Sequence, residues 1–556
     1  MEKMPEVKAF QDGSKVWEAE LDLFSVVTYL PKSELPSDIV NFGFRAPYLM
    51  VFPEKRLSGE EAKAFADAKG FSKVASDFAG SVTFFYPLGE GGWEKATEQF
   101  YIDILHHSRI SQYYQDGCAI MYDRFAKKMG NPNLRGTVTR TFLYGWGISA
   151  DYIAKNCLKE LKGDGLFGPG DITPTACVLE GLSVIPNPER RDIPVLSVGN
   201  GEKDGAINAA LLAGLDHVLI KDQSDVPVDF REFVGTFRRM VGYLNREDDF
   251  EKMGMVCEPD YVTVKTSPDN RGDDKDTTEH RIGYVAFYNK GIMDDGKKVP
   301  LLMCFHGGGD STFYMAITSG WYRIAAKYGF LLICVENHLN STATETMELI
   351  GKLKEKYSID ETKIYASGFS MGGCKSWDMM QEYPEVYAAV APMDATFEVG
   401  LNSSGEPIGE YNQSVLVPVF YAGGEITPLP ELPFQAQKCL DRMRYVFEVN
   451  QVVKPYDVKL EEKEKWENPI WGISGDFTYQ LVNAERDNSI LTLQLFVSRN
   501  GKCYSVFGSV GGQGHEVRHH TCEQAWKFMS QFRRLPDGQI EGGEVEKVKA
   551  LYAGQS

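Results

Sequence analysis

Short apolar runs of strand length alternate with longer helical patterns along the whole chain of 556 residues. This alternation is typical of a mostly parallel β-sheet with helices on both faces, so the sequence predicts an α/β fold. In the C-terminal half we expect strands at residues 261–265, 282–288, 300–305, 330–335, 363–366, 388–391, 417–421 and 502–507. We expect helices near residues 319–327, 344–356, 372–382, 434–447 and 522–533.

The N-terminal half repeats the order of the C-terminal half. The strand candidate at residues 47–52 parallels the one at 300–305. Position 147 stands 55 residues before Glu202, and Ser370 stands 55 residues before Glu425 (202 − 147 and 425 − 370). We therefore infer two tandem copies of one α/β domain, at residues 16–245 and 255–540.

The composition is that of an ordinary globular protein, with 43% hydrophobic and 25% charged residues. A formal charge of −19 provides no cluster of Lys and Arg for a polyanion, so we do not expect nucleic acid as a partner. There is no uncharged run of 18 apolar residues and no signal-like apolar segment at the N-terminus, and we expect a cytoplasmic protein without membrane contact. The ten cysteines are scattered singly, which predicts buried thiols rather than disulfides or a metal site.

A candidate nucleophile lies in the C-terminal copy, in the motif G-x-S-x-G at residues 368–372. A β-rich segment precedes the motif and a helical pattern follows it, which is the strand-turn-helix context that such a nucleophile requires. Glycines on both sides allow the neighbouring elements to approach the turn closely. We expect Ser370 to be the nucleophile of a serine hydrolase.

A second glycine-rich segment, His306-Gly307-Gly308-Gly309, follows the strand candidate at residues 300–305. Small residues there leave backbone N–H groups free to face a substrate oxygen. We expect the N–H of Gly307 or Gly308, together with that of Met371, to form the oxyanion hole. A phosphate-binding loop would need a Lys-Ser or Lys-Thr pair after the glycines, and none follows.

The serine needs a base, because its hydroxyl is inert at its own pKa. His515 lies in a glycine-rich loop after the last predicted strand, where a hydrolase of the chain order Ser, acid, His places its base. His519 and His520 are the alternatives. Two further histidines, His306 and His338, follow strands and are expected to line the substrate pocket.

The third member of a triad is expected after the penultimate strand, where Glu425 follows the apolar run at residues 417–421. A glutamate can orient the imidazole and stabilise its charged form as an aspartate does. Asp394, after the preceding strand, is the alternative acid.

About 90 residues separate Glu425 from His515, more than one helix and one strand need. We therefore expect an insertion at about residues 430–500. It contains Trp466 and Trp471 among polar and turn residues, which form either a satellite core of the insertion or a wall of the substrate pocket.

These motifs together resemble the polyhydroxybutyrate-depolymerase and feruloyl-esterase branch of the α/β-hydrolases. The resemblance covers roughly residues 280–535 and rests on the segments at 306–309, 365–373 and 514–515 and on Tyr383-Pro384-Glu385 with the apolar run that follows it. It implies hydrolysis of carboxylic esters through an acyl-enzyme, without a metal or organic cofactor. Glutamate stands where that branch usually has aspartate, and we expect a soluble ester such as an acylated sugar, a hydroxycinnamate or a hydroxyacyl oligomer.

The N-terminal copy lacks the corresponding chemistry. Gly147 stands at the nucleophile position, Pro53-Glu54-Lys55 replaces the glycine-rich loop, and residues 221–227 contain no histidine. Ser149 is the one possible substitute. We expect a catalytically silent domain that supports the active one or mediates self-association into a homo-oligomer.

Three other functions are compatible with parts of the sequence. A peptidase of the prolyl-oligopeptidase type shares the catalytic order but usually carries a β-propeller, which the α/β pattern of residues 1–245 opposes. Acyl transfer to an acceptor other than water uses the same acyl-enzyme. The intact C-terminal motifs disfavour a non-catalytic scaffold.

Overall fold

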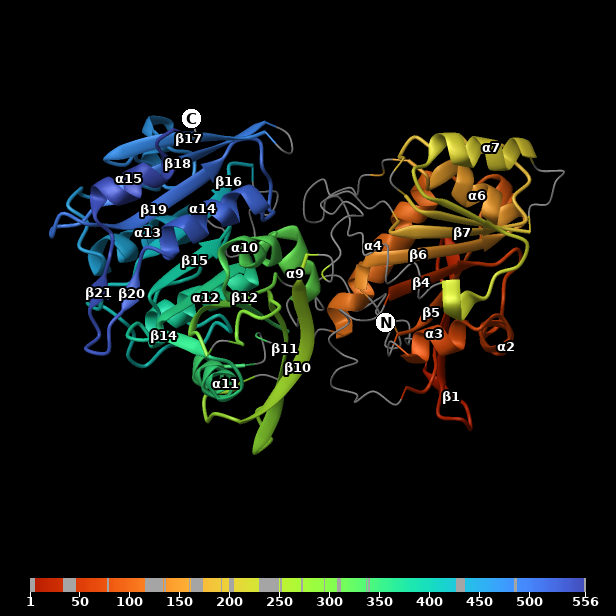
Figure 1. Cartoon of the computed structure of the whole chain (residues 1–556), viewed down its shortest axis with the longest axis horizontal. Coiled ribbons are helices and arrows are strands. Elements are labelled where there is room, and N and C mark those ends of the chain that lie inside the picture. The colour runs from red at the N-terminus through yellow and green to blue at the C-terminus, as the bar shows by residue number, and fades with distance from the viewer. Residues whose placement is uncertain are drawn as a thin grey trace. The chain divides into compact units, whose positions relative to one another are not determined.

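The structure is a computed structural model. It describes residues 6–33, 47–77, 80–115, 134, 137–159, 161, 174–191, 193–199, 205–229, 250, 253–271, 274–294, 296–307, 312–336, 338, 341–426, 436–484 and 488–554. The chain forms two compact units, and the change from the first to the second falls between Met253 and Gly254. Each unit is built on one large β-sheet (Figure 1).

The C-terminal unit contains a ten-stranded sheet in the order β10-β11-β13-β12-β14-β15-β16-β19-β18-β17. The six strands from β13 to β19 run parallel, and antiparallel pairs flank them at both edges. The strands are β10 (Met255–Lys265), β11 (Glu279–Asn289), β12 (Val299–Phe305), β13 (Leu331–Val335), β14 (Ile359–Phe369), β15 (Ala389–Met393), β16 (Val419–Gly424), β17 (Phe477–Asn483), β18 (Ser489–Val497) and β19 (Cys503–Val510). The helices are α9 (Thr312–Thr318), α10 (Trp321–Tyr328), α11 (Ala343–Lys356), α12 (Met371–Glu382), α13 (Ala436–Val449), η4 (Leu460–Lys465), α14 (His519–Met529) and α15 (Val545–Tyr552), and a two-stranded ribbon joins β20 (Arg533–Arg534) to β21 (Ile540–Glu541).

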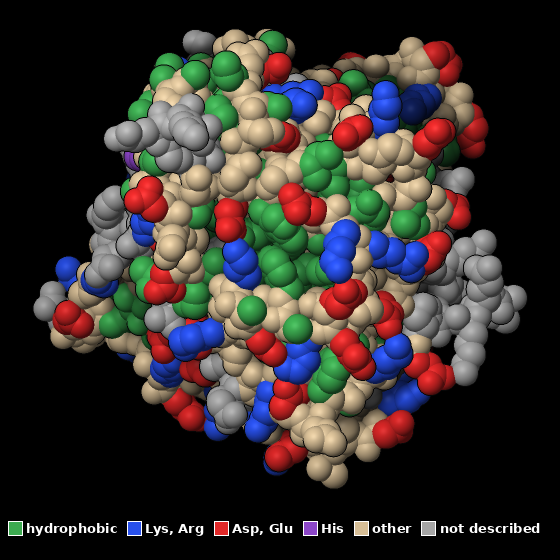
Figure 2. All heavy atoms as spheres, turned by 90° about the vertical axis from the view of Figure 1, so that its right-hand side faces the viewer, with side chains coloured by type: hydrophobic (Ala, Val, Ile, Leu, Met, Phe, Trp, Pro, Cys, Tyr) green, Lys and Arg blue, Asp and Glu red, His purple; other side chains and the backbone are tan. Residues whose placement is uncertain are grey.

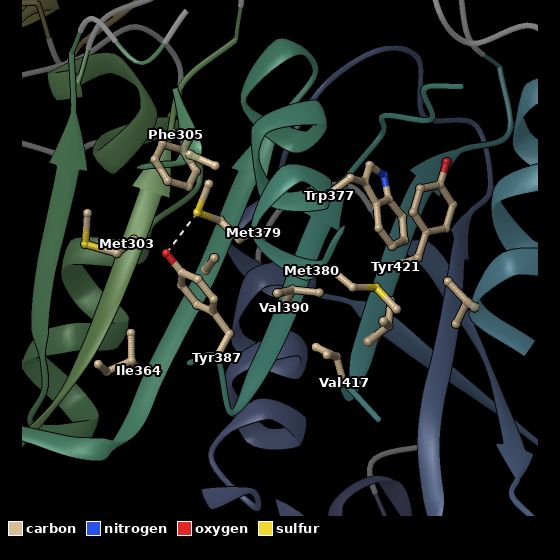
Figure 3. Close-up of a cluster of buried hydrophobic side chains, with 14 of the residues drawn as sticks. Met303, Phe305, Ile364, Trp377, Met379, Met380, Tyr387, Val390, Val417 and Tyr421 are labelled. Carbon is tan, nitrogen blue, oxygen red and sulfur yellow. Dashed lines mark hydrogen bonds between the residues drawn. The ribbon is translucent and has the colours of Figure 1, made fainter. Parts of the chain in front are cut away.

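Helices cover both faces of this sheet because side chains alternate in direction along each strand. In β14, Tyr365 packs edge-on against Trp526 of α14. Its neighbour Ile364 belongs to the core beneath α12, which also contains Trp377. Figure 3 shows this core, in which the Tyr387 hydroxyl reaches the sulfur of Met379. α12, which follows the predicted nucleophile, is therefore fixed on the sheet by buried side chains.

The α/β class predicted from the alternating pattern is confirmed, and each of the eight expected strands overlaps an observed one. The hairpin β17–β18 was not expected. It lies inside the expected insertion and extends the sheet beyond β19 with antiparallel pairing.

The N-terminal unit has a nine-stranded sheet in the order β1-β2-β3-β5-β4-β6-β7-β8-β9. When β2 and β3 are matched with β10 and β11, the strands from β5 to β9 follow the order of β13 to β19. The two sheets therefore share one topology apart from β1 and the added hairpin. The strands are β1 (Lys8–Ala9), β2 (Lys15–Glu20), β3 (Phe24–Leu30), β4 (Pro47–Phe52), β5 (Val82–Pro87), β6 (Thr137–Trp146), β7 (Ala176–Glu180), β8 (Val195–Val198) and β9 (Val218–Lys221), with helices α2 (Gly59–Lys69), α3 (Phe71–Asp77), η1 (Gly92–Glu94), α4 (Glu98–Gln115), α6 (Ile148–Asn156) and α7 (Gly205–Gly214).

One face of the molecule carries apolar side chains gathered among acidic and basic ones (Figure 2). In the N-terminal unit, the exposed large hydrophobic side chains include Leu212, Leu219, Ile220 and Val228. Self-association through this unit stays a prediction. Among the helices that the structure describes, none has the length and apolar character needed to cross a bilayer.

Candidate active site

Ser370 lies on a sharp turn between β14 and α12. Its backbone angles are φ 55° and ψ −119°, a region that residues with a Cβ rarely adopt. Glycines make the turn possible: a Cβ on Gly368 would lie 2.1 Å from the carbonyl oxygen of Gly372, and a Cβ on Gly372 would lie 2.1 Å from that of Phe305. This is the strained geometry expected of a nucleophile that is presented on a tight turn.

His515 connects Ser370 to an acidic residue. Its Nε2 lies 2.9 Å from Oγ of Ser370, and its Nδ1 lies 2.9 Å from Oδ2 of Asp394. All three side chains are at least nine-tenths buried, and the imidazole ring packs on Phe369 with ring centroids 4.6 Å apart. The arrangement has the connectivity of a serine, a base and an orienting acid.

The acid that faces His515 is Asp394. The expectation that Glu425 would face His515 is therefore wrong. Glu425 is exposed, and its Oε1 accepts a hydrogen bond from the Ser509 hydroxyl at 2.9 Å. Asp394 directly follows β15, the strand next to β14, and the N–H of Ser370 donates to the carbonyl of Met393 at 3.0 Å. The position after β15 is therefore beside the nucleophile.

Burial raises the pKa of Asp394, while the charge and hydrogen bond of His515 and the N–H of Gly424 act in the opposite direction. Gly424 is the residue before Glu425. The end of β16, where the acid was expected, therefore contributes a backbone N–H to Asp394, and the acid itself follows β15.

The alternative base, His519, lies at the start of α14 and packs against the turn between α9 and α10. A Cβ on Gly320 in that turn would lie 2.5 Å from the His519 ring. The other alternative, His520, is the second residue of the same helix. The ring that hydrogen bonds Ser370 is His515, as expected.

Two of the three residues expected in the oxyanion hole are described. Met371 is the first residue of α12, so its N–H has no acceptor within its own helix. Gly307 is buried next to the strand end, and its carbonyl oxygen lies 2.7 Å from Nδ1 of His306. Gly308 lies outside the described residues. The oxyanion hole stays a prediction on these positions.

The His306 ring does not line a substrate pocket as expected. Its two nitrogens lie near backbone carbonyls, those of Gly307 and Glu336. His338 is likewise buried, with Nε2 2.8 Å from the carbonyl oxygen of His306. Both rings thus lie among the backbone carbonyls that follow β12 and β13.

Of the two tryptophans expected near the pocket, Trp471 is core. It is fully buried, packs against Tyr421 and Phe507, and donates its indole N–H to the carbonyl of Ile473. Trp466 is half-buried against the edge of the same core. Trp471 therefore belongs to the main core of the C-terminal unit, because its partners Tyr421 and Phe507 lie outside the expected insertion, and it forms neither a satellite core nor a pocket wall.

A small polar hollow, open to solvent, lies beside α12. Lys375 and Asp378 on this helix line it and are almost fully buried. Lys375 donates to the carbonyl of Ser341, and Asp378 accepts two hydrogen bonds from Ser403. Exposed polar groups of Arg271 and other loop residues complete a lining that offers both donors and acceptors.

The N-terminal unit has kept the turn and lost the side chains. Gly147 has φ 54° and ψ −125°, the geometry of Ser370, and its N–H donates to Glu180 as that of Ser370 does to Met393. Gly181 directly follows β7, as Asp394 follows β15, and has φ 64°. The positions that correspond to Ser370 and Asp394 are thus both glycine in the N-terminal unit.

Two further features oppose a second active site in that unit. The Glu54 carboxylate occupies the space in front of the turn, 1.8 Å from where a Cβ of Gly147 would lie. Ser149 is fully buried and donates its hydroxyl to the carbonyl of Phe52 at 2.6 Å. Within the part of the chain that the structure describes, no group of three or more His, Cys, Asp and Glu could hold a metal ion.

Comparison with known proteins gave one curated relative and several solved structures. No family model matches the chain. A bifunctional acetylxylan esterase/xylanase of Neocallimastix patriciarum is 25% identical over 134 residues, 22% of this chain and 19% of the relative. The chain thus spans about a fifth of the length of that relative.

The solved structures are more distant. An acetyl xylan esterase from Aspergillus awamori is 14% identical with a TM-score of 0.32, over 49% of this chain and 99% of that one. A feruloyl esterase module from Clostridium thermocellum, complexed with sinapinate, is 14% identical with a TM-score of 0.28, over 49% and 86%. A putative dipeptidyl aminopeptidase IV from Bacteroides ovatus is 16% identical with a TM-score of 0.25, over 37% and 33%.

Proposed function

We propose that the C-terminal unit is a serine hydrolase of carboxylic esters, with Ser370 as nucleophile, His515 as base and Asp394 as orienting acid. The observation that carries the proposal is the buried chain of two 2.9 Å contacts from Ser370 through His515 to Asp394. A hydroxyl becomes a nucleophile when a positioned base takes its proton, and this is the contact that such a transfer requires.

In the first half of the reaction, Oγ of Ser370 attacks the ester carbonyl and its proton passes to Nε2 of His515. The imidazolium that forms is stabilised by the Asp394 carboxylate at Nδ1. The N–H of Met371 and an N–H of the glycine-rich loop that begins at Gly307 stabilise the negative charge on the former carbonyl oxygen by hydrogen bonds. His515 then protonates the departing alcohol, which leaves an acyl group on Ser370.

In the second half, His515 takes a proton from water, and the resulting attack on the acyl-enzyme releases the acid and restores Ser370. The sequence of steps requires no cofactor. Replacement of water by another acceptor would give acyl transfer, and the two outcomes differ only in the acceptor that reaches the acyl group.

For the substrate we propose a soluble ester with a polar alcohol, such as an acylated sugar. The support is the polar hollow beside α12. Lys375 and Asp378 in its wall belong to α12, the helix that begins directly after Ser370. Mixed donors and acceptors, as in Asp269, Arg271 and Asn402, are suited to hydroxyl groups rather than to an apolar chain. The relative from Neocallimastix patriciarum is an acetylxylan esterase by name, which agrees with this choice.

A peptidase of the prolyl-oligopeptidase type is the rival. The described strands of the N-terminal unit form one sheet with a parallel centre, interleaved with helices, and not the blades of a β-propeller. A panel of acetyl, hydroxycinnamoyl and aryl esters beside peptide amides separates the two. We expect turnover of the esters, lost in Ser370→Ala, and none of the amides. Turnover of amides with esters untouched would overturn the ester assignment.

A further inference from the structure

Asp394 lies where the chain leaves β15, and its backbone is fixed on the side of that strand. Its own N–H donates to the carbonyl oxygen of Ala422 at 2.6 Å, and the carbonyl oxygen of Met393 accepts the N–H of Ser370 at 3.0 Å. Asp394 has a positive φ of 46°, so the extended strand ends here. The direction of its carboxylate therefore also depends on what holds the backbone that follows.

Trp377 of α12 holds the residue directly after the acid. Its side chain is fully buried, and its indole N–H donates to the carbonyl oxygen of Ala395 at 2.9 Å. The helix and this part of the chain are in close contact, since a Cβ on Gly373 would lie 2.5 Å from Cβ of Ala395. The helix that begins directly after Ser370 thus also anchors the chain beside Asp394.

The indole of Trp377 is fixed in turn by residues of two other elements. The ring of Tyr421, on β16, stacks against it with centroids 6.4 Å apart (Figure 3). The guanidinium of Arg442, on α13, lies 5.0 Å from the indole centroid. Arg442 is fully buried and donates from Nε and Nη2 to the carbonyl oxygen of Phe397 at 3.2 and 2.9 Å, and from Nη2 to that of Glu398 at 3.1 Å. One side chain therefore contacts both the indole and the chain that the indole holds.

The burial of Arg442 is unfavourable for a charged group. Burial lowers the pKa of its guanidinium to about 10, so the group still carries its charge at neutral pH. Within the described part of the chain Arg442 forms no ion pair, and its contacts are carbonyl oxygens and the rings of Trp377 and Tyr445. A buried charge without an ion pair is costly, which indicates a role beyond packing.

The N-terminal unit has neither member of this pair. Trp377 comes seven residues after Ser370, and seven residues after the equivalent Gly147 the chain has Ala154 (377 − 370 and 154 − 147). α7 follows β8 as α13 follows β16, and α7 contains no arginine. The same strand order is thus formed without the pair, in the unit that also has glycine at the positions of the nucleophile and the acid.

That unit holds the corresponding chain in a simpler way. Asp151 of α6 accepts the N–H groups of Ser183 and Val184, at 2.8 and 3.2 Å, a short distance after Gly181. Fastening this connection to the helix therefore requires neither an indole nor a guanidinium. What Trp377 adds in the C-terminal unit is a contact to the residue directly after the acid.

We propose that Trp377 and Arg442 are positioning residues for Asp394, which fix the backbone after the acid and so hold its carboxylate on Nδ1 of His515. The proposal rests on the proposed function, because it concerns the 2.9 Å contact between Asp394 and His515. Both residues act through the backbone of residues 395–398 and not through substrate. A displacement of about 1 Å at a catalytic group can lower the rate by about a hundredfold, so this anchor bears directly on turnover.

The test is made on the full chain with Trp377→Phe, which removes the N–H that reaches Ala395 and keeps an aromatic ring. We expect kcat for an aryl ester to fall roughly ten- to a hundredfold with KM nearly unchanged, because the carboxylate acts on the imidazolium of the transition state. The deciding measurement adds Asp394→Asn to Trp377→Phe. If Trp377 acts through Asp394, the double variant should have the kcat of Asp394→Asn alone, within about twofold.

The matched control is Trp471→Phe. Trp471 is equally buried, packs against the same Tyr421 and donates its indole N–H to a backbone carbonyl, that of Ile473 at 2.8 Å. We expect this variant to lose a similar free energy of unfolding in urea and to keep kcat within about twofold. The positioning role is refuted by an unchanged kcat in Trp377→Phe, by an equal loss of kcat in both tryptophan variants, or by a full further loss in the Asp394→Asn background.

Failure of the proposed function has a different signature. If fluorophosphonate did not label the wild-type protein, or if Asp394→Asn kept the wild-type kcat, the triad itself would be wrong. If Trp377→Phe does not fold, Arg442→Lys is measured in the same cycle, since lysine keeps the charge but lacks the planar fork that spans two carbonyls. We expect a loss of kcat that disappears in the Asp394→Asn background. A kcat that stays at the wild-type value, or a loss that persists in that background, would overturn the proposal.

Discussion

Oδ2 of Asp394 lies 2.9 Å from Nδ1 of His515, and the Asp394 backbone is left-handed, with φ 46°. Ser370 likewise has a positive φ, and in the N-terminal unit both places are taken by glycine. A residue with a Cβ seldom adopts φ 55° with ψ −119°, and the strain of such a conformation is on the order of 1–3 kcal/mol. The two units therefore share the backbone geometry of this turn, and only the C-terminal unit carries side chains at both positions.

The first prediction concerns the acid. Asp394→Asn should lower kcat by up to about ten-thousandfold, as the loss of the orienting carboxylate does in serine proteases, because an amide can hold the wrong tautomer. Glu425→Gln should change kcat within about twofold, since the side chain is exposed and bonds Ser509. Steady-state kinetics of both variants with one aryl ester decides between them. A larger loss of kcat in Glu425→Gln than in Asp394→Asn would identify Glu425, after β16, as the acid.

The second prediction concerns strain at the nucleophile. Ser370→Gly should be more stable than Ser370→Ala by about 1 kcal/mol or more, because glycine relieves the φ of 55° and alanine keeps it. The control is Ser376, inside α12, where the helix favours the alanine variant over the glycine variant by about 1 kcal/mol. Urea unfolding of the four variants measures both differences. The same order at both positions would show that the turn at Ser370 is not strained.

The third prediction concerns pH and stability. The folded pKa of Glu336 is raised to about 7 by burial, above its value in the unfolded chain, so the folded state binds more protons in between. Wild-type stability should therefore fall relative to Glu336→Gln as the pH rises from about 4.5 to about 7, by on the order of 3 kcal/mol. Above that range the difference between the two proteins should be constant. Urea midpoints of the two proteins across this range provide the measurement, and a difference that does not vary with pH would contradict the shift.

The fourth prediction separates the two tryptophans. Trp471→Ala should reduce the free energy of unfolding by about 3–5 kcal/mol, because it leaves a cavity among Tyr421 and Phe507. Trp466→Ala should have a smaller effect, since the ring is half-exposed. Thermal unfolding of the two variants tests the ranking. Equal melting temperatures would contradict the difference in burial between the two tryptophans.

The sequence predicts those parts of the site that local patterns determine. Ser370 stands out because the turn, its glycines and its flanking strand and helix are all local. His515 is identified by a glycine-rich loop between the last strand and the last long helix. The choice between Asp394 and Glu425 depends on which of two neighbouring strands ends beside the histidine, and no local pattern contains that register.

Contacts between residues far apart in the chain are also beyond local sequence patterns. Glu336 and His338 contact His306 across 30 and 32 residues of the chain, and only the folded register brings these residues together. The hairpin β17–β18 had a usable signal, because Phe477, Tyr479 and Leu481 alternate with more polar or exposed residues as in an edge strand.

The central claim is that Ser370 is the nucleophile, and intact-mass spectrometry after reaction with a fluorophosphonate tests it most directly. The wild-type chain should gain one label, and peptide mapping should place it on Ser370. Ser370→Ala should gain none, and His515→Ala should react far more slowly because the base is lost. A label that persists undiminished in Ser370→Ala, or that maps to Ser149 of the N-terminal unit, would contradict the account.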